Sequence, residues 1–288
     1  MPIANIHDRA SLERVYPCDA YASDASENER RKPAVLKGVR ITAAPDDAGD
    51  FAFEPAASHA GEVPGAMFLA PFHRVTAQED AAADPDPRHG YEAFLDEIAV
   101  RRGLDPVELR LALLKNTPRG QAVMREVAAM ADYRRPRPGR GLGISFVDYS
   151  GTMVAAVAEV SVDKKSGAIH VHDFWLALDP GIAVHPDNVI AQTENSIIYG
   201  LGLTLSERIS FKEGVVQQHN IRDYGVPRMG DIPEMHIKLV ATPNRPTGAG
   251  QMATPIVAPA ISAAVFAASG VRVRHTPFLP ERVLRALA

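Results

Sequence analysis

The sequence predicts an α+β fold in which mixed sheets pack against helices. Two stretches, residues 153–163 and 168–178, alternate like strands, and Lys164-Lys165-Ser166-Gly167 between them is a hairpin signal. Residues 186–205 instead carry apolar side chains at helical spacing behind Pro186, which predicts a long helix. Strand pairs that alternate with helices, without an internal repeat of fixed period, favour the α+β class.

The N-terminal part of the chain predicts less regular structure. Residues 1–90 mix charge, proline and alanine, although residues 34–42 alternate like a strand and residues 65–72 are apolar. Helical spacing then begins at Tyr91 and stops at Gly103. Two further helices are expected after it, the first capped by Asp105 and the second over residues 122–131.

A segment rich in proline, arginine and glycine, residues 134–143, is interpreted as a hinge after this helical layer. We therefore expect two domains: residues 1–140, an irregular segment with a helical layer, and residues 141–288, a β-rich domain. Within the second, residues 220–233 are expected to form a rigid non-helical loop held by Arg–Asp pairs. A hairpin at residues 213–214 and a strand over residues 234–240 complete the expected elements.

Composition excludes several classes of protein. The chain has 31 basic and 35 acidic residues, too little positive charge for a nucleic-acid binder. Its one cysteine, Cys18, cannot form an internal disulfide or supply the thiolates of an iron–sulfur cluster. The N-terminus lacks a basic region followed by an apolar run, so we expect a cytoplasmic protein. Residues 253–270 are apolar, but their prolines and small residues favour a buried helix over a membrane span.

Three sets of polar or glycine residues are candidates for function. The loop at residues 246–251, Pro-Thr-Gly-Ala-Gly-Gln, precedes a helix and could bring its backbone close to a ligand with an anionic group, although glycines there also fit ordinary turn chemistry. Gln192, Glu194 and Asn195 form either a solvated helix face or a set of partners for a polar cofactor. His170 and His172 share a strand face, but without a third ligand an exposed strand edge explains them better than a metal, and no metal ligand is predicted.

Four segments in order carry a family resemblance. They are VAAVAEVSVD (154–163), LALDPGIAVHPDNVIAQTENSIIYGLGLTLSE (176–207), QQHNIRDYGVPRMGDIPEM (217–235) and PTGAGQMATPIVAPAISAAVFAASGVRVRHTPF (246–278). Together they resemble the C-terminal molybdopterin-binding half of the large subunit of the xanthine dehydrogenase and aldehyde oxidase family, in particular its isoquinoline 1-oxidoreductase-like branch. The helical stretch after Tyr91 extends the likeness toward the N-terminus.

The resemblance implies a molybdenum hydroxylase subunit acting on an N-heteroaromatic or aldehyde small molecule. Its cofactor would be a molybdopterin, in the cytosine dinucleotide form, with iron–sulfur clusters only on a partner chain. By family position, Gln192 would contact the pterin, and Gly248, Ala249 and Gly250 would approach the metal. The next position would carry the catalytic residue, which in the family is a glutamate and here is Gln251.

The glutamine at position 251 opens a second interpretation. A carboxamide has no usable basic site near neutral pH, so Gln251 could orient a substrate but could not act as a general base. The alternative is therefore a repurposed relative without molybdenum that performs a non-redox reaction or serves as a scaffold subunit.

The family's large subunit is much longer than 288 residues, so this chain would supply only half of a site. We expect it to be a separately encoded half of a split subunit, or otherwise a fragment of a longer chain. Its partners would be the chain of the N-terminal half and an iron–sulfur subunit. The apolar helix at residues 258–268 is then expected to expose apolar surface when the chain is alone.

Overall fold

The computed structural model describes residues 12–17, 38–45, 51–54, 77–79 and 87–288, except residues 150, 213, 214 and 241. In its first part, a small antiparallel sheet forms around one strand, which pairs with three others. The central strand is β2 (Gly38–Pro45), and its neighbours are β1 (Leu12–Pro17), β3 (Phe51–Glu54) and β4 (Ala77–Glu79). β2 overlaps the expected strand at residues 34–42, whereas residues 65–72 and Cys18 lie outside the described residues.

Three helices follow, as the sequence predicts. They are α1 (Pro87–Arg101), α2 (Pro106–Leu113) and α3 (Pro118–Met130). The start of α2 is fixed by Asp105, whose carboxylate accepts hydrogen bonds from Val107 N at 2.8 Å and Glu108 N at 3.2 Å. The expected N-cap is thereby confirmed.

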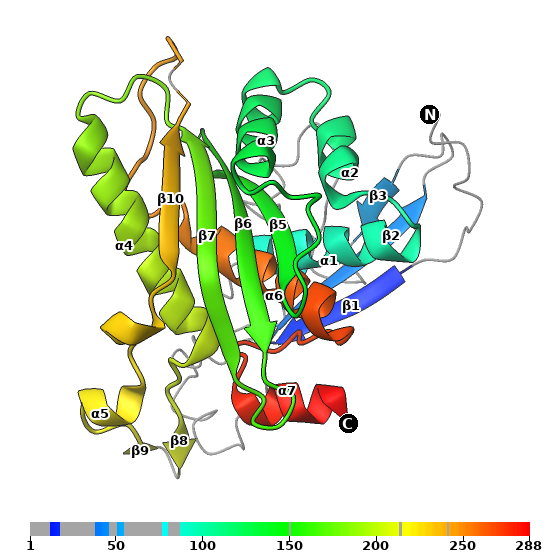
Figure 1. Ribbon diagram of the computed structural model, residues 1–288, viewed down its shortest axis with the longest axis vertical. Helices are drawn as coiled ribbons and strands as arrows, with labels where there is room; N and C mark the ends of the chain where they lie inside the picture. Colours follow the sequence, from blue (N-terminus) through cyan, green and yellow to red (C-terminus); the bar gives the residue numbers. More distant parts are fainter. Residues whose placement is uncertain are drawn as a thin grey trace.

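A mixed sheet forms the centre of the molecule (Figure 1). Its strand order is β10-β7-β6-β5, with β5 (Gly141–Tyr149), β6 (Thr152–Val162), β7 (Ile169–Asp179) and β10 (Glu234–Leu239). Strand β6 pairs antiparallel with β5 and with β7, and β10 is parallel to β7. A parallel pair needs a crossover connection, and α4 (Pro186–Leu205) provides it with the predicted bounds. The α+β class is confirmed.

Strand β5 corrects the interpretation of residues 134–143 as a hinge. Gly141 and Gly143 lie inside β5, where they allow the strand to touch the backbone of α6 (Thr254–Ser269). A Cβ on Gly143 would lie 2.1 Å from Ala260 O, and one on Gly141 would lie 2.2 Å from Ala264 O. These glycines therefore serve close packing between strand and helix rather than chain flexibility.

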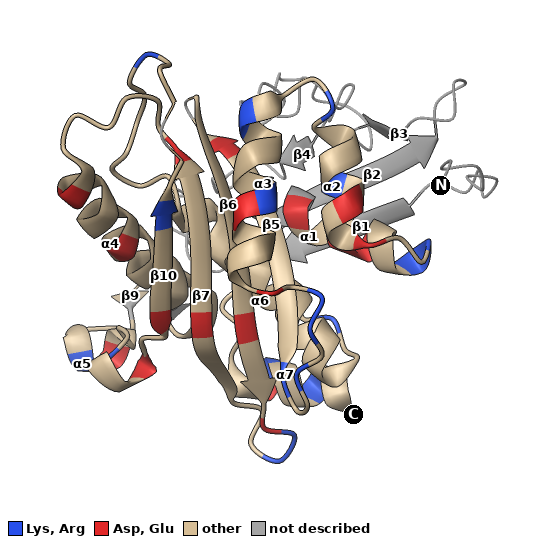
Figure 2. Ribbon diagram, turned by 45° about the horizontal axis from the view of Figure 1, so that its top comes forward, with Lys and Arg blue, Asp and Glu red and all other residues tan. Residues whose placement is uncertain are grey.

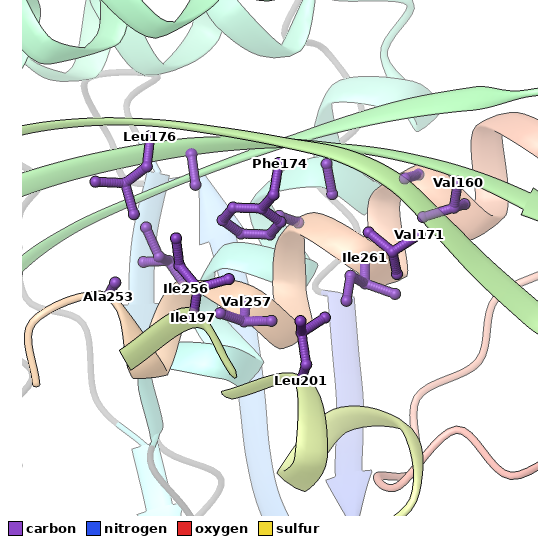
Figure 3. Packing of buried hydrophobic residues seen from close by; sticks show 14 of the residues in the cluster. Val160, Val171, Phe174, Leu176, Ile197, Leu201, Ala253, Ile256, Val257 and Ile261 are labelled. Atoms are coloured by element: carbon purple, nitrogen blue, oxygen red, sulfur yellow. The ribbon is translucent and has the colours of Figure 1, made fainter. Parts of the chain in front are cut away.

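The main hydrophobic core lies between one face of the sheet and helices α4 and α6. Figure 3 shows Phe174 and Leu176 of β7 facing Ile256 and Ile261 of α6, with Ile197 of α4 beside them. All five side chains are fully buried. α6 carries no charged residue along its length, as Figure 2 also shows, and ten of its sixteen residues are buried. The expected buried helix is confirmed over residues 259–265, which the chain's own sheet and helices cover. The expected apolar exposure is therefore limited to the ends of the range 258–268, where Ala267 is exposed and Phe266 and Ala268 are partly buried.

The opposite face of the sheet is covered in part by α2 and α3. Val123 and Val127 of α3 share a second core with Phe146, Val157 and Trp175 of the strands. Further along this face, two side chains cover Trp175. The ring of His236 stacks on it with the ring centroids 5.3 Å apart, and the Arg137 guanidinium carbon lies 5.2 Å from the ring centroid. The helical layer therefore packs directly on the β-rich part, while the division of the chain at residue 140 stays a prediction.

Short elements complete the described part of the chain. They are the hairpin of β8 (Phe211–Lys212) and β9 (Val215–Val216), helix α5 (Ile221–Tyr224), the 3₁₀-helix η2 (Met229–Asp231) and helix α7 (Pro280–Leu287). The expected loop at residues 220–233 thus contains two helical turns. Its aspartates accept backbone N–H groups, Asp231 from Arg228 N and Asp223 from His219 N, and these bonds replace the expected Arg–Asp pairs. No helix of the described residues is both long and apolar enough to span a membrane.

Candidate functional site

The loop at residues 246–251, called here the Gly-rich loop, leads into α6 and is held at its start by two threonines. Thr247 N donates to Pro180 O at 2.9 Å, and the Thr247 hydroxyl lies 3.0 Å from the same carbonyl. Thr152, at the start of β6, places its hydroxyl 2.7 Å from that of Thr247 and also donates to Gly248 O. The first half of the loop is therefore fixed to the ends of β6 and β7.

The end of the Gly-rich loop is held against α4 by Ser196. The buried Ser196 hydroxyl lies 3.0 Å from Gly250 O and 2.8 Å from Gln192 O, so it can donate to either carbonyl. In the other direction, the Thr254 hydroxyl donates to Ser196 O at 3.3 Å. The structure thus brings two of the predicted site elements together, the turn of α4 that contains Gln192 and the Gly-rich loop. Sequence reasoning missed Ser196 because a serine inside a helix carries no signal of a tertiary partner.

Arg119 of α3 supports this arrangement from the other side of the sheet end. Its Nε donates to Asp179 Oδ2 at 2.6 Å and its remaining nitrogens reach Asp179 O at 2.8 Å and Gly151 O at 3.1 Å. Thr242 and Gly181 N donate to Asp179 Oδ1, at 2.7 and 2.8 Å. Burial raises the pKa of Asp179, but the hydrogen bonds from these groups outweigh it and hold the pKa below its usual value. This ion pair ties together the strand ends to which the Gly-rich loop is fixed.

The Gly-rich loop is exposed at its end and partly buried in its middle. Gln192, Gly250 and Gln251 are exposed, whereas Gly248 and Ala249 are partly buried. A Cβ built on Gly250 would meet no heavy atom of the described chain within 4 Å. The backbone of the Gly-rich loop at Gly250 is therefore accessible to a ligand beside α4.

The start of α6 contributes less than the sequence suggests. Thr254 N donates to Gln251 O at 3.3 Å, Ile256 N donates to Ala253 O at 3.2 Å, and Pro255 has no N–H. The backbone N–H groups of residues 254–256, with which a helix N-terminus would bind an anion, are thus already bonded or absent. An anionic group at this helix would depend on the helix dipole rather than on these N–H groups.

The remaining candidate residues have local explanations. Glu194 and Asn195 are exposed on α4, which agrees with a solvated helix face. His172 bonds the Ser161 hydroxyl at 2.8 Å, and the ring of His170 contacts the ring of His172 edge-on at 4.4 Å. Both histidines lie where β7 pairs with β6 and before its pairing with β10 begins. Among the described residues no group of three or more His, Cys, Asp or Glu could hold a metal ion.

Comparison with known proteins places the chain in a family. Residues 115–233 match the family model of the molybdopterin cofactor-binding domain. The chain is 38% identical over 193 residues to isoquinoline 1-oxidoreductase subunit beta of Brevundimonas diminuta, an alignment that covers 66% of this chain and 25% of that protein. It is 32% identical over 218 residues to a membrane-bound aldehyde dehydrogenase (pyrroloquinoline-quinone) of Gluconacetobacter polyoxogenes, covering 69% of this chain and 28% of that protein.

Solved structures agree on the fold. Quinoline 2-oxidoreductase from Pseudomonas putida 86 superimposes with a TM-score of 0.70 at 13% identity, covering 88% of this chain and 62% of that one. The chain contains a molybdopterin cofactor-binding domain of the xanthine dehydrogenase and aldehyde oxidase family. It spans about a quarter of the length of the curated relatives that it matches.

Proposed function

We propose that this chain is one part of the large subunit of a molybdenum hydroxylase-like oxidoreductase that acts on an N-heteroaromatic or aldehyde small molecule. The names of the two curated relatives support these substrate classes. The observation that carries the proposal is the Gly-rich loop, which is fixed at both ends yet leaves open space at Gly250 beside α4.

In this proposal the chain's own residues bind and orient. Gln192 would hydrogen-bond a molybdopterin, in its cytosine dinucleotide form, through an exposed amide that both donates and accepts. Gly248, Ala249 and Gly250 would line the cofactor with backbone, since no side chain larger than a methyl group stands between it and the loop. When bound, the cofactor would supply the two-electron redox centre at which a substrate carbon is hydroxylated.

Gln251 would face the substrate as a hydrogen-bonding group. Its amide can donate to a substrate acceptor or accept from a substrate N–H, but it cannot remove a proton at neutral pH. Proton removal would then fall to solvent or to another group. We therefore expect this chain to support slower turnover than a relative with glutamate at this position.

The partners in this proposal are the remainder of the large subunit and an iron–sulfur subunit. The segment that contains α5 and η2 has no buried residue in either turn, and it exposes Ile221 at 75%, Val226 at 41% and Met229 at 91%. Large apolar side chains on a locally hydrogen-bonded segment favour contact with another polypeptide surface. The single cysteine supports clusters on a different chain.

Cofactor analysis of the purified complex tests the proposal. The full chain is co-expressed with the polypeptides encoded beside it, purified without oxygen, and analysed for molybdenum, iron, pterin and pyrroloquinoline quinone. Molybdenum and pterin near one per chain, with iron on a second polypeptide, are expected. Quinone without molybdenum, or no cofactor in an intact complex, would contradict the proposal.

A further inference from the structure

Tyr149, the last residue of β5, contacts the side chain at the end of the Gly-rich loop. Gln251 Nε2 donates to the Tyr149 hydroxyl at 3.1 Å, across 102 positions of sequence. Gln251 is exposed, so this contact bears on a side chain of the loop that a ligand could reach.

The two partners are each held in place without the other. The Tyr149 ring packs against the main core, and its backbone faces Thr152 across a turn in which Gly151 N donates to Asp148 Oδ1 at 3.1 Å. The Gly-rich loop is fixed separately by Thr152 and Ser196. A phenol on a rigid strand end therefore faces an amide on a rigid loop, so the contact does not require either backbone to move.

We propose that Tyr149 is a positioning residue that sets the orientation of the side chain at position 251. The inference rests on the proposed function, in which that side chain faces the substrate. With the amide nitrogen directed to the phenol, the carbonyl oxygen of Gln251 remains as an acceptor for an N–H or O–H group of a ligand. An unrestrained glutamine would sample other rotamers, which this hydrogen bond opposes.

The phenol can hold a carboxylate as well as an amide, because its hydroxyl both donates and accepts. This gives a measurement that needs neither cofactor nor activity. In Gln251→Glu the Tyr149 hydroxyl should donate to the introduced carboxylate and favour its charged form. Its acid dissociation constant should then be about three- to tenfold larger than in the double variant Gln251→Glu with Tyr149→Phe.

The experiment titrates the full chain, labelled with carbon-13 at glutamate Cδ, by NMR. The introduced carboxyl is identified as the resonance absent from the unchanged protein. Gln251→Glu with Tyr199→Phe is the matched control, because Tyr199 is an exposed tyrosine on α4. Asp148 is present in every variant, so its effect on the dissociation constant of the introduced carboxyl is the same in each. Equal dissociation constants with and without the Tyr149 hydroxyl would overturn the inference.

A second measurement covers the case in which Tyr149→Phe does not fold. In the unchanged protein, the Gln251 side-chain amide should show a higher order parameter than the exposed amide of Gln192. Equal mobility of the two amides would contradict the positioning role. The proposed function fails separately, through cofactor analysis, so a Tyr149 effect in a protein without molybdenum would uphold the positioning and reject the function.

Discussion

Glycine serves opposite purposes in two regions of this molecule. At the contact between β5 and α6, Gly143 leaves no room for a Cβ, which would lie 2.1 Å from Ala260 O and 2.2 Å from Ala264 N. In the Gly-rich loop, Gly250 is exposed and a Cβ there would meet nothing within 4 Å. The first glycine is required by this chain's own packing, whereas the second borders open space among the described residues, where a ligand could approach the backbone.

The two regions also differ in how their polar groups are satisfied. Along the α6 interior, the Ser145 hydroxyl donates to Ile256 O at 2.8 Å and the surrounding side chains are apolar. Around the Gly-rich loop, threonine and serine hydroxyls bind backbone carbonyls while Gln192 and Gln251 remain exposed. The loop is thus a polar support held by hydrogen bonds, with the Gln192 side chain and the carbonyl oxygen of Gln251 directed to its exposed side.

The largest expected effect is on the packed glycine. Gly143→Ala places a methyl group into the backbone of α6, which cannot move away as a flexible side chain could. We expect a loss of about 3 kcal/mol or more in the free energy of unfolding, measured by urea denaturation.

Gly250→Ala is the matched control for that substitution. Its methyl group enters open space, so the free energy of unfolding should change by less than about 0.5 kcal/mol. In the complex the same methyl group should lower cofactor content, because it fills the space beside α4. If both substitutions lowered the free energy of unfolding equally, the two glycine positions would not differ in the room that they leave for a side chain.

Arg119→Ala should have the next largest effect, because it leaves the fully buried Asp179 carboxylate without its cationic partner. Removing one partner of a buried pair costs about 3–5 kcal/mol, and the partial exposure of Arg119 reduces our expectation to about 2–3 kcal/mol. Arg119→Lys should recover only part of this, since lysine cannot reproduce the contacts to Asp179 O and Gly151 O.

The ion pair also predicts a pH dependence. Because the folded pKa of Asp179 is lowered, its contribution to stability is present above the unfolded value of about 3.9 and is lost as pH falls below it. The unfolding free energy of Arg119→Ala should therefore fall less steeply below pH 4 than that of the unchanged protein. Parallel curves would show that the Arg119 contact does not lower the pKa.

The sequence predicted what depends on local pattern. Helix α4 has the predicted bounds because Pro186 and the apolar spacing define it within one stretch of chain. Strand β5 escaped detection because Gly141 and Gly143 look like hinge residues until α6, more than a hundred positions later, is placed against them. The contact of Arg119 with Asp179 and that of Ser196 with Gly250 were missed for the same reason, since each joins elements far apart in sequence.

A smaller effect, on rate rather than stability, is expected at position 251. Gln251→Glu places a proton acceptor where the family resemblance implies a glutamate, and turnover should rise about tenfold or more if proton removal limits the rate. The measurement is kcat of the cofactor-loaded complex with an N-heteroaromatic or aldehyde substrate. A fall in kcat would instead show that the amide donates a hydrogen bond to the substrate, which an ionised carboxylate cannot do.

The smallest effect on the isolated chain is expected at Gln192, although its effect on the complex should be clear. Its side chain is exposed on α4, while the contact with Ser196 uses its backbone carbonyl, which a substitution retains. Gln192→Ala should therefore change the free energy of unfolding by less than about 0.5 kcal/mol. If the amide binds the pterin, loss of that hydrogen bond should still lower pterin content in the purified complex.

Asn195→Ala is the control, because Asn195 is also exposed on α4 and is not assigned to the cofactor. Equal pterin content in both variants would remove Gln192 from the site and confine cofactor contact to the Gly-rich loop.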